Sequence, residues 1–253
     1  MSDTPPQVAF QVAVSAKKQS KLGTGGTSQE TQRSIYFYAE RTAGGDMFLQ
    51  PLNANFVPAG EKIPITQEAF IQKYRPEPLI FYNKVKPAMD TLASELHKGD
   101  QNLERGRLDK AEAAYKKVLD IDSANIKAIF SLGIAYLKGG NTEDAGGIFD
   151  KIMSLDLAFG PEHTHLFNEF GIRMRKADML DKALDYYRKA AALNADDEHL
   201  LFNMARIHFE LRDFPSAGES LRQALKINPG LSVAVRMLKS VERLADMPGE
   251  QNP

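Results

Sequence analysis

The sequence repeats its small residues at an interval of 34 positions, and this interval constrains the fold more than any other feature. From Gly133 to Gly171 the interval is 38, so four residues are inserted at that point without disturbing the units. A period of 34, with small residues where two helices must touch, is typical of helix-turn-helix solenoids. Pairs one interval apart are Gly99 and Gly133, Gly171 and Ala205, Ala111 and Ala145, and Ala183 and Ala217.

The interval predicts an all-α solenoid of helix-turn-helix repeats over residues 92–245. A last stretch from residue 231 to 245 has apolar residues three apart and is expected to cover the exposed flank of the final repeat. Such arrays hold other molecules on a surface, so the function should lie there and not in a catalytic pocket. The four units run approximately over residues 92–125, 126–159, 164–197 and 198–231.

Composition excludes several functions. A formal net charge of −1 and a pI near 6.5 give no general reason to bind nucleic acid or an anionic membrane. The absence of cysteine excludes disulfides, thiolate metal sites and cysteine nucleophiles. The N-terminus lacks the positive charge of a secretory signal, and no later stretch reaches a membrane-spanning length of apolar residues. We therefore expect a cytoplasmic protein without membrane insertion.

The first 91 residues differ from the repeats in composition and in residue pattern. Residues 1–33 are rich in Gly, Ser, Thr, Gln and Lys and are expected to form a flexible tail. Within that tail VAFQVAV has strand propensity and could pair with a sheet edge, although a partly sticky tail is the favoured interpretation. Residues 34–91 form an N-terminal extension with a β-hairpin, whose turn uses positive φ at Gly44 and Gly45, followed by short helices after an N-cap at Thr66. Residues 246–253 form a second tail.

The repeat columns resemble the tetratricopeptide repeat. The resemblance is carried in the second unit by Leu132, Gly133, Tyr136, Gly140, Ala145, Phe149 and Leu155. Small residues at a crossing let the helix backbones approach, and the aromatic residues fill the adjoining space. The resemblance implies an all-α superhelical solenoid, right-handed, whose concave face is lined by the first helix of each repeat. It also implies binding of a peptide or protein segment.

Family columns also imply which side chains reach that concave face. Aromatic and basic residues are mixed on it, which suits a segment with an acidic or C-terminal group. We expect Asn168 and Arg206 to make the polar contacts and Phe130 and Phe202 to act as apolar anchors. The alternative is that individual members pack against neighbouring helices or are merely solvated. The predicted partner-binding residues are Lys127, Phe130, Ile134, Leu137, His165, Asn168, Ile172, Arg175, His199, Phe202, Arg206 and Phe209.

Catalytic, metal and cofactor sites are not expected. No strand is expected before the stretch LGTGGTSQ, which also lacks the lysine that follows in a phosphate loop, and no Ser-His-Asp arrangement is recognisable. His165 and His199 share one column, but a solvated or capping role is favoured over a metal site. The two-carboxylate clamp that some family members use on chaperone tails is a poor match, because Leu96 and Asp100 occupy its first columns.

Two functions remain open from the sequence. In the first, the array is an adaptor that grips a segment of another protein. In the second, it is a scaffold that forms a homo-oligomer, with the N-terminal strands or the tail of one copy docked on a neighbouring copy. Gly146 and Gly147 inside a second helix cost about 1 to 2 kcal/mol relative to alanine, so another backbone is expected close by or the helix is locally loose. The inserted stretch around Pro161 is a further candidate rim for binding.

Overall fold

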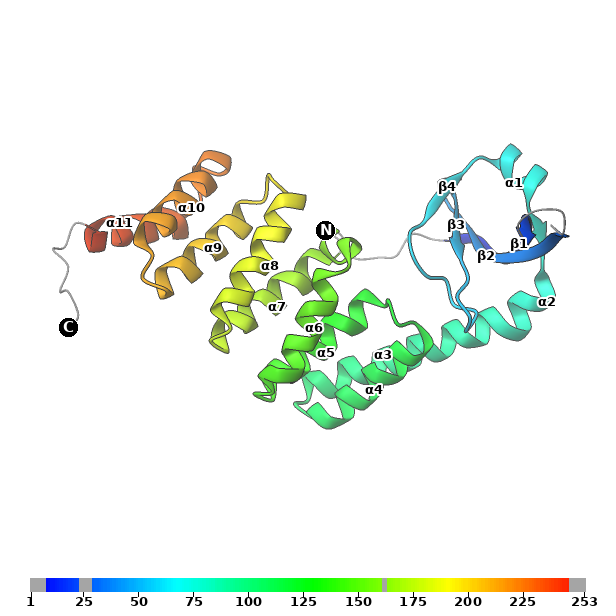
Figure 1. Ribbon diagram of the computed structural model, residues 1–253, viewed down its shortest axis with the longest axis horizontal. Coiled ribbons are helices and arrows are strands. Elements are labelled where there is room, and N and C mark those ends of the chain that lie inside the picture. The colour runs from blue at the N-terminus through cyan, green and yellow to red at the C-terminus, as the bar shows by residue number, and fades with distance from the viewer. Residues whose placement is uncertain (1–7, 23–28, 161–162, 246–253) are drawn as a thin grey trace. The chain divides into compact units, whose positions relative to one another are not determined.

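The computed structural model describes residues 8–22, 29–160 and 163–245 (Figure 1). The chain divides into two compact units. The sheet unit comprises the described residues up to Gln101 together with residues 113–125, and the repeat unit comprises residues 102–112 and the chain from Ile126 onward.

The sheet unit is built on a five-stranded antiparallel sheet with the order β4-β3-β2-β1-β5. The predicted hairpin is the β2–β3 pair, in which Tyr38 lies opposite Gln50. Its turn differs from the expectation in one respect, because only Gly45, with φ of 96°, adopts a positive φ and Gly44 does not. The strands are β1 Val8–Leu22, β2 Gln29–Thr42, β3 Met47–Pro51, β4 Ile63–Ile65 and β5 Arg75–Pro76.

Part of the expected flexible tail instead forms β1, the longest strand. β1 pairs with β2 along its length, and its central Ala13 and Val14 have no exposed surface. The segment VAFQVAV therefore pairs with the hairpin instead of forming a tail, because Ala13 packs on one face of the sheet and Val14 on the other. Residues 1–7 and 23–28 of the predicted tail, and the predicted tail 246–253, lie outside the described residues.

Helices cover both faces of the sheet. On one face Ala13 and Tyr38 pack with Phe81 and Val85, which belong to the single π-helical turn η1 (Phe81–Val85) that follows α2 (Pro78–Ile80). On the other face the sheet packs against Phe70 and Tyr74 at α1 (Gln67–Lys73). Thr66 caps α1 as predicted, because its hydroxyl accepts from the Ala69 amide at 3.3 Å.

The first helix pair of the array is α3 (Lys86–Glu104) and α4 (Leu108–Ile121). A Cβ atom at Gly99 would lie 2.5 Å from the Tyr115 ring, so glycine is required for this close approach. The end of α4 is held by the loop after β3, because Asn53 Nδ2 donates to the Ile121 carbonyl at 2.9 Å. Asn55 Nδ2 donates to the same carbonyl, also at 2.9 Å.

The repeat unit continues as antiparallel helix pairs (Figure 1). First helices contact first helices, with α5 against α7 and α7 against α9, and α11 closes the unit against α10. The predicted solenoid of helical repeats with an N-terminal β-hairpin is confirmed. The elements are α5 Ile126–Lys138, α6 Thr142–Met153, the 3-10 helix η2 Asp156–Phe159, α7 Thr164–Lys176, α8 Leu180–Leu193, α9 Glu198–Glu210, α10 Phe214–Ile227 and α11 Ser232–Ala245.

Small residues lie at the helix crossings, as the interval predicts. A Cβ atom at Gly133 would lie 2.5 Å from the Phe170 ring, and one at Gly171 would lie 2.5 Å from Tyr187. Ala145 and Ala183 have no exposed surface. In the described part of the chain, no helix has an apolar stretch long enough to cross a lipid bilayer.

Candidate partner-binding site

The predicted binding residues of α5 are divided between surface and core. Lys127 is exposed, but Phe130 has no exposed surface and Ile134 is 2% exposed. The Phe130 ring packs edge-to-face on Phe170, with 6.0 Å between the ring centroids. The expected anchor Phe130 therefore contributes to the core, because its column faces a neighbouring helix that supplies an aromatic partner. Ile134 and the 9% exposed Leu137 are buried in the same way.

The corresponding columns of α7 and α9 remain accessible. Their residues are half-buried, with part of each side chain at the surface. Phe202 and Phe209 also pack against the buried cluster around Ala205 and Leu221, so their rings are held by the core. We call this surface the first-helix face, and it consists of Asn168, Ile172, Arg175, Phe202, Arg206 and Phe209.

His165 and His199 precede the first-helix face at the start of α7 and α9. Both side chains are exposed. Within residues 8–22, 29–160 and 163–245, no group of three or more His, Cys, Asp or Glu side chains is arranged to hold a metal ion.

Two arginines lie on the first-helix face with one carboxylate. Arg175 on α7 forms an ion pair with Glu210, the last residue of α9, and its side chain is only 10% exposed. Arg206 lies one helical turn before Glu210 on the same helix, yet among the described residues it forms no ion pair. Its guanidinium carbon lies 6.0 Å from the centroid of the Phe202 ring. The face therefore presents one cation, Arg206, that forms no ion pair with the described residues.

The two arginines, Glu210 and Tyr187 of α8 affect one another's charge states. Burial, and next the positive charge of Arg175, lower the pKa of Arg206, while Glu210 and Tyr187 oppose this effect. Burial raises the pKa of the Tyr187 hydroxyl, and both arginines oppose that rise. Tyr187 reaches this position because Gly171 leaves room for its ring, and its hydroxyl lies 3.5 Å from the Asn168 carbonyl.

Asn168 adds to this face a hydrogen-bond acceptor that no donor satisfies in the structure. Its side-chain oxygen Oδ1 is buried and has no hydrogen-bond partner in the structure. A buried amide oxygen that gives up water without gaining a partner costs about 1 to 3 kcal/mol. A ligand with an N–H group at this point would recover that free energy. Of the two residues that we expected to make polar contacts, Asn168 thus has an unbonded side-chain oxygen, and Arg206 has no ion pair within the part of the chain that the structure describes.

Sequence reasoning missed two residues of this site. Glu210 follows Phe209 and lies outside the family columns, although its position four residues after Arg206 indicates a shared helix face. Tyr187 is on a second helix, which the columns do not cover. The signal for Tyr187 is the repeated glycine-to-tyrosine spacing, since Gly99 and Tyr115 are also 16 residues apart.

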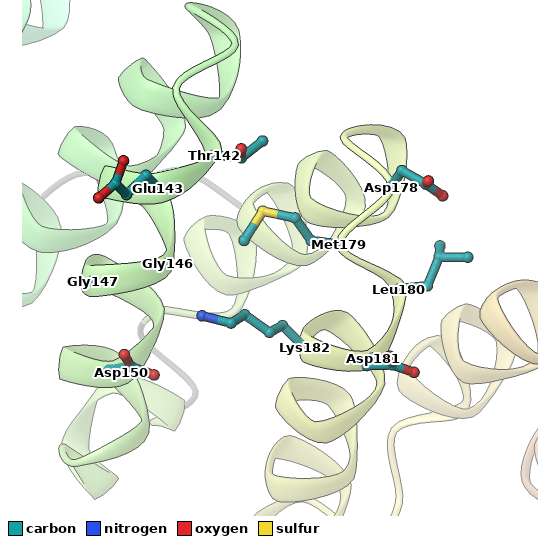
Figure 2. Close-up of a pocket in the computed structure, with 10 residues that line it drawn as sticks. All are labelled: Thr142, Glu143, Gly146, Gly147, Asp150, Asp178, Met179, Leu180, Asp181 and Lys182. Carbon is teal, nitrogen blue, oxygen red and sulfur yellow. The ribbon is translucent and has the colours of Figure 1, made fainter.

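A separate groove lies between α6 and the start of α8 (Figure 2). It has a volume of about 510 Å³ and includes Gly146 and Gly147, but none of the predicted binding residues lines it. Lys182 points across the groove toward α6, where its Nζ would lie 2.9 Å from a Cβ atom at Gly146. Nothing lies within 4 Å of a Cβ atom at Gly147. The expected close backbone is thus replaced at Gly146 by a flexible lysine side chain.

The inserted residues before α7 are partly anchored in the core. Phe159 of η2 is 2% exposed and packs on Tyr186, with 5.4 Å between the ring centroids. Asn194 Nδ2 donates to the Phe159 carbonyl at 3.0 Å. The insertion therefore fills space between repeats, and its candidate rim residue Pro161 lies outside the described residues.

Comparison with known families agrees with this architecture. A family model described as TPR repeat matches residues 99–140, and one described as tetratricopeptide repeat matches residues 174–241. Residues 99–140 and 174–241 thus match models of the tetratricopeptide repeat. Repeats of this kind are in general non-catalytic modules of protein interaction.

Individual relatives share these repeats over part of their length. Tetratricopeptide repeat protein 8 of Caenorhabditis elegans is 32% identical over 126 residues, which is 49% of this chain and 24% of that protein. Protein O-mannosyl-transferase TMTC1 of Homo sapiens is 26% identical over 139 residues, which is 55% of this chain and 16% of that protein. The chain spans about a quarter or less of the length of these relatives. A crystal structure of MamA protein has a TM-score of 0.49 and 22% identity, covering 61% of this chain and 82% of that one.

Proposed function

We propose that this protein is an adaptor without catalytic activity that binds a segment of another protein on its first-helix face. The proposal is carried by two groups on that face: the Arg206 guanidinium, which forms no ion pair among the described residues, and the buried Asn168 Oδ1 atom, which has no hydrogen-bond partner. The family resemblance implies binding at these columns and supports the same conclusion. The absence of cysteine is compatible with a cytoplasmic location, which forms part of this proposal.

The charge of Arg206 favours an acidic or C-terminal group on the partner. Its guanidinium is partly removed from water and lies close to a second cation, Arg175. A carboxylate would relieve both costs, because a planar guanidinium donates two parallel hydrogen bonds to the two oxygens of a carboxylate. A charge-assisted hydrogen bond of this kind contributes about 1.5 to 3 kcal/mol.

The Asn168 oxygen favours a peptide over a free anion. A backbone N–H of the bound segment would donate to Oδ1, which has no other donor. Partly exposed rings of Phe202 and Phe209 lie on the same face and offer apolar contact on either side of Arg206. They replace Phe130 in the role of anchors, since Phe130 has no exposed surface.

A peptide selection tests the proposal. The immobilised full-length protein is used to select binders from a random peptide library, and their affinities are then measured for Asn168→Ala combined with Arg206→Ala. We expect the double variant to lose about tenfold or more in affinity. The matched control is Arg222→Ala with Gln223→Ala, which removes a guanidinium and an amide from the exposed side of α10.

The outcomes separate two locations for binding. Selected peptides that lose affinity for the double variant but not for the α10 control support the first-helix face. Equal affinities for the parent and the double variant would place binding elsewhere on the chain. Circular dichroism of each variant checks that the helical fold is retained.

A further inference from the structure

We propose that Glu210 is a built-in competitor for the anion site of Arg175 and Arg206, and that the carboxylate of a bound acidic segment replaces it. This inference rests on the proposed function and names the residue that regulates it. In the free protein the carboxylate of Glu210 is held by Arg175 across the α7–α9 contact.

The geometry gives Glu210 a choice of two partners. An Arg and a Glu four residues apart on one helix are neighbours on its surface, so Arg206 is within reach of Glu210 on α9. Glu210 instead pairs with Arg175, which lies 35 residues earlier on the adjacent first helix. The Arg175 side chain is nine-tenths buried, whereas that of Glu210 is 36% exposed. The buried cation is therefore satisfied by a carboxylate that can still move into solvent.

A second carboxylate at Arg206 would alter this balance. It would lie next to Glu210, because residues four apart on a helix have Cβ atoms about 5 to 6 Å apart. Two like charges at that separation repel, so Glu210 opposes the binding of an acidic group while Arg206 attracts it. If Glu210 swings out, the incoming carboxylate faces the two guanidiniums, whose positive charges also act on the buried Tyr187 hydroxyl.

The ion pair of Glu210 determines how strongly the carboxylate of a partner must interact with the arginines in order to bind. A neutral segment gains little from displacing Glu210 and meets a face whose buried arginine is already paired. An acidic segment must supply a carboxylate that interacts with the arginines better than Glu210 does. Glu210 thereby selects for acidic segments that bind strongly, and it lowers their apparent affinity by the free energy of its own ion pair.

The experiment uses two short fluorescein-labelled peptides. One has a single Asp between two Phe residues, and its twin has Asn in place of the Asp. Affinities of both peptides are measured by fluorescence anisotropy for the parent protein, Glu210→Gln and the control Glu169→Gln. Glu169 lies on α7 in an exposed ion pair with Arg173, so the control removes the same charge from another ion pair.

We expect Glu210→Gln to bind the Asp peptide about tenfold more tightly than the parent does, with a change of less than about twofold for the Asn twin. Glu169→Gln should leave both affinities unchanged. A purely structural role for Glu210 would instead lower the unfolding temperature and give no gain in affinity, which overturns the inference. Nuclear magnetic resonance of the arginine Nε–H groups should show Arg175 shifting when the Asp peptide is added to the parent.

Failure of the inference and failure of the proposed function give different results. If the parent binds the Asp peptide better than its twin and Glu210→Gln binds both as the parent does, the competitor role is wrong while the binding face stands. If neither peptide binds to any variant and the library selection also yields no binder that depends on Arg206, both proposals are wrong.

Discussion

The same family columns have different fates in α5 and α9. Phe130 and Phe202 occupy one column, but Phe130 has no exposed surface whereas Phe202 is half-buried. The next column, one helical turn later, holds the buried Ile134 in α5 and the cation Arg206 in α9. The difference shows that a repeat column fixes the direction of a side chain, while the neighbouring helix decides whether that side chain reaches a partner.

Replacing the phenylalanine of this column should give the largest contrast. Phe130→Ala removes a fully buried ring that packs on Phe170, so we expect a loss of about 3 to 5 kcal/mol in the free energy of unfolding. Phe202→Ala should cost about 1 kcal/mol, because part of its ring already contacts water. Urea unfolding of both variants measures the difference. Equal losses in the free energy of unfolding would mean that the two phenylalanine rings are buried to the same extent.

A methyl group added at a helix crossing should have the next largest effect. In Gly171→Ala the new Cβ atom would lie 2.5 Å from the Tyr187 ring, so the ring must move. We expect a loss of about 1 to 3 kcal/mol in the free energy of unfolding. Weaker binding of the Asp peptide should accompany it, since the Tyr187 hydroxyl lies close to Arg175 and Arg206. An unchanged unfolding midpoint in urea would contradict this account of the crossing.

The smallest predicted effect is a gain in the free energy of unfolding. Gly147 lies inside α6 with nothing within 4 Å of its added Cβ atom, so alanine meets no obstacle there. Gly147→Ala should raise the free energy of unfolding by about 0.5 to 1 kcal/mol, because alanine loses less backbone entropy in a helix. The same urea series checks this gain. A loss of stability would show that another group approaches Gly147 closely.

The sequence predicts the repeats because their information is local and periodic. Helix pairs, the glycines at crossings and the cap at Thr66 follow from spacing and from the steric needs of each position. The strand β1 could not be assigned with the same certainty, because its stability comes from pairing with β2 and from burial of Ala13 and Val14. Strand formation in that segment depends on long-range contacts that its composition does not reveal.

The binding face is predictable only in part for a related reason. Columns predict that Asn168 and Arg206 share a face, but they do not show that Glu210 on α9 pairs with Arg175. Glu210 belongs to no column, and its pairing with Arg175 depends on how α7 and α9 pack. Burial of Phe130 likewise depends on Phe170, which lies 40 positions later in the sequence.

The most direct test of the account is a double-mutant cycle between Arg206 and the bound carboxylate. Affinities are measured for the parent and Arg206→Ala, each with the Asp peptide and its Asn twin. Direct contact between the guanidinium and the carboxylate predicts a coupling free energy above about 1.5 kcal/mol. Losses that add within about 0.5 kcal/mol would show that Arg206 and the acidic group do not meet, and they would contradict binding of an acidic segment at this arginine.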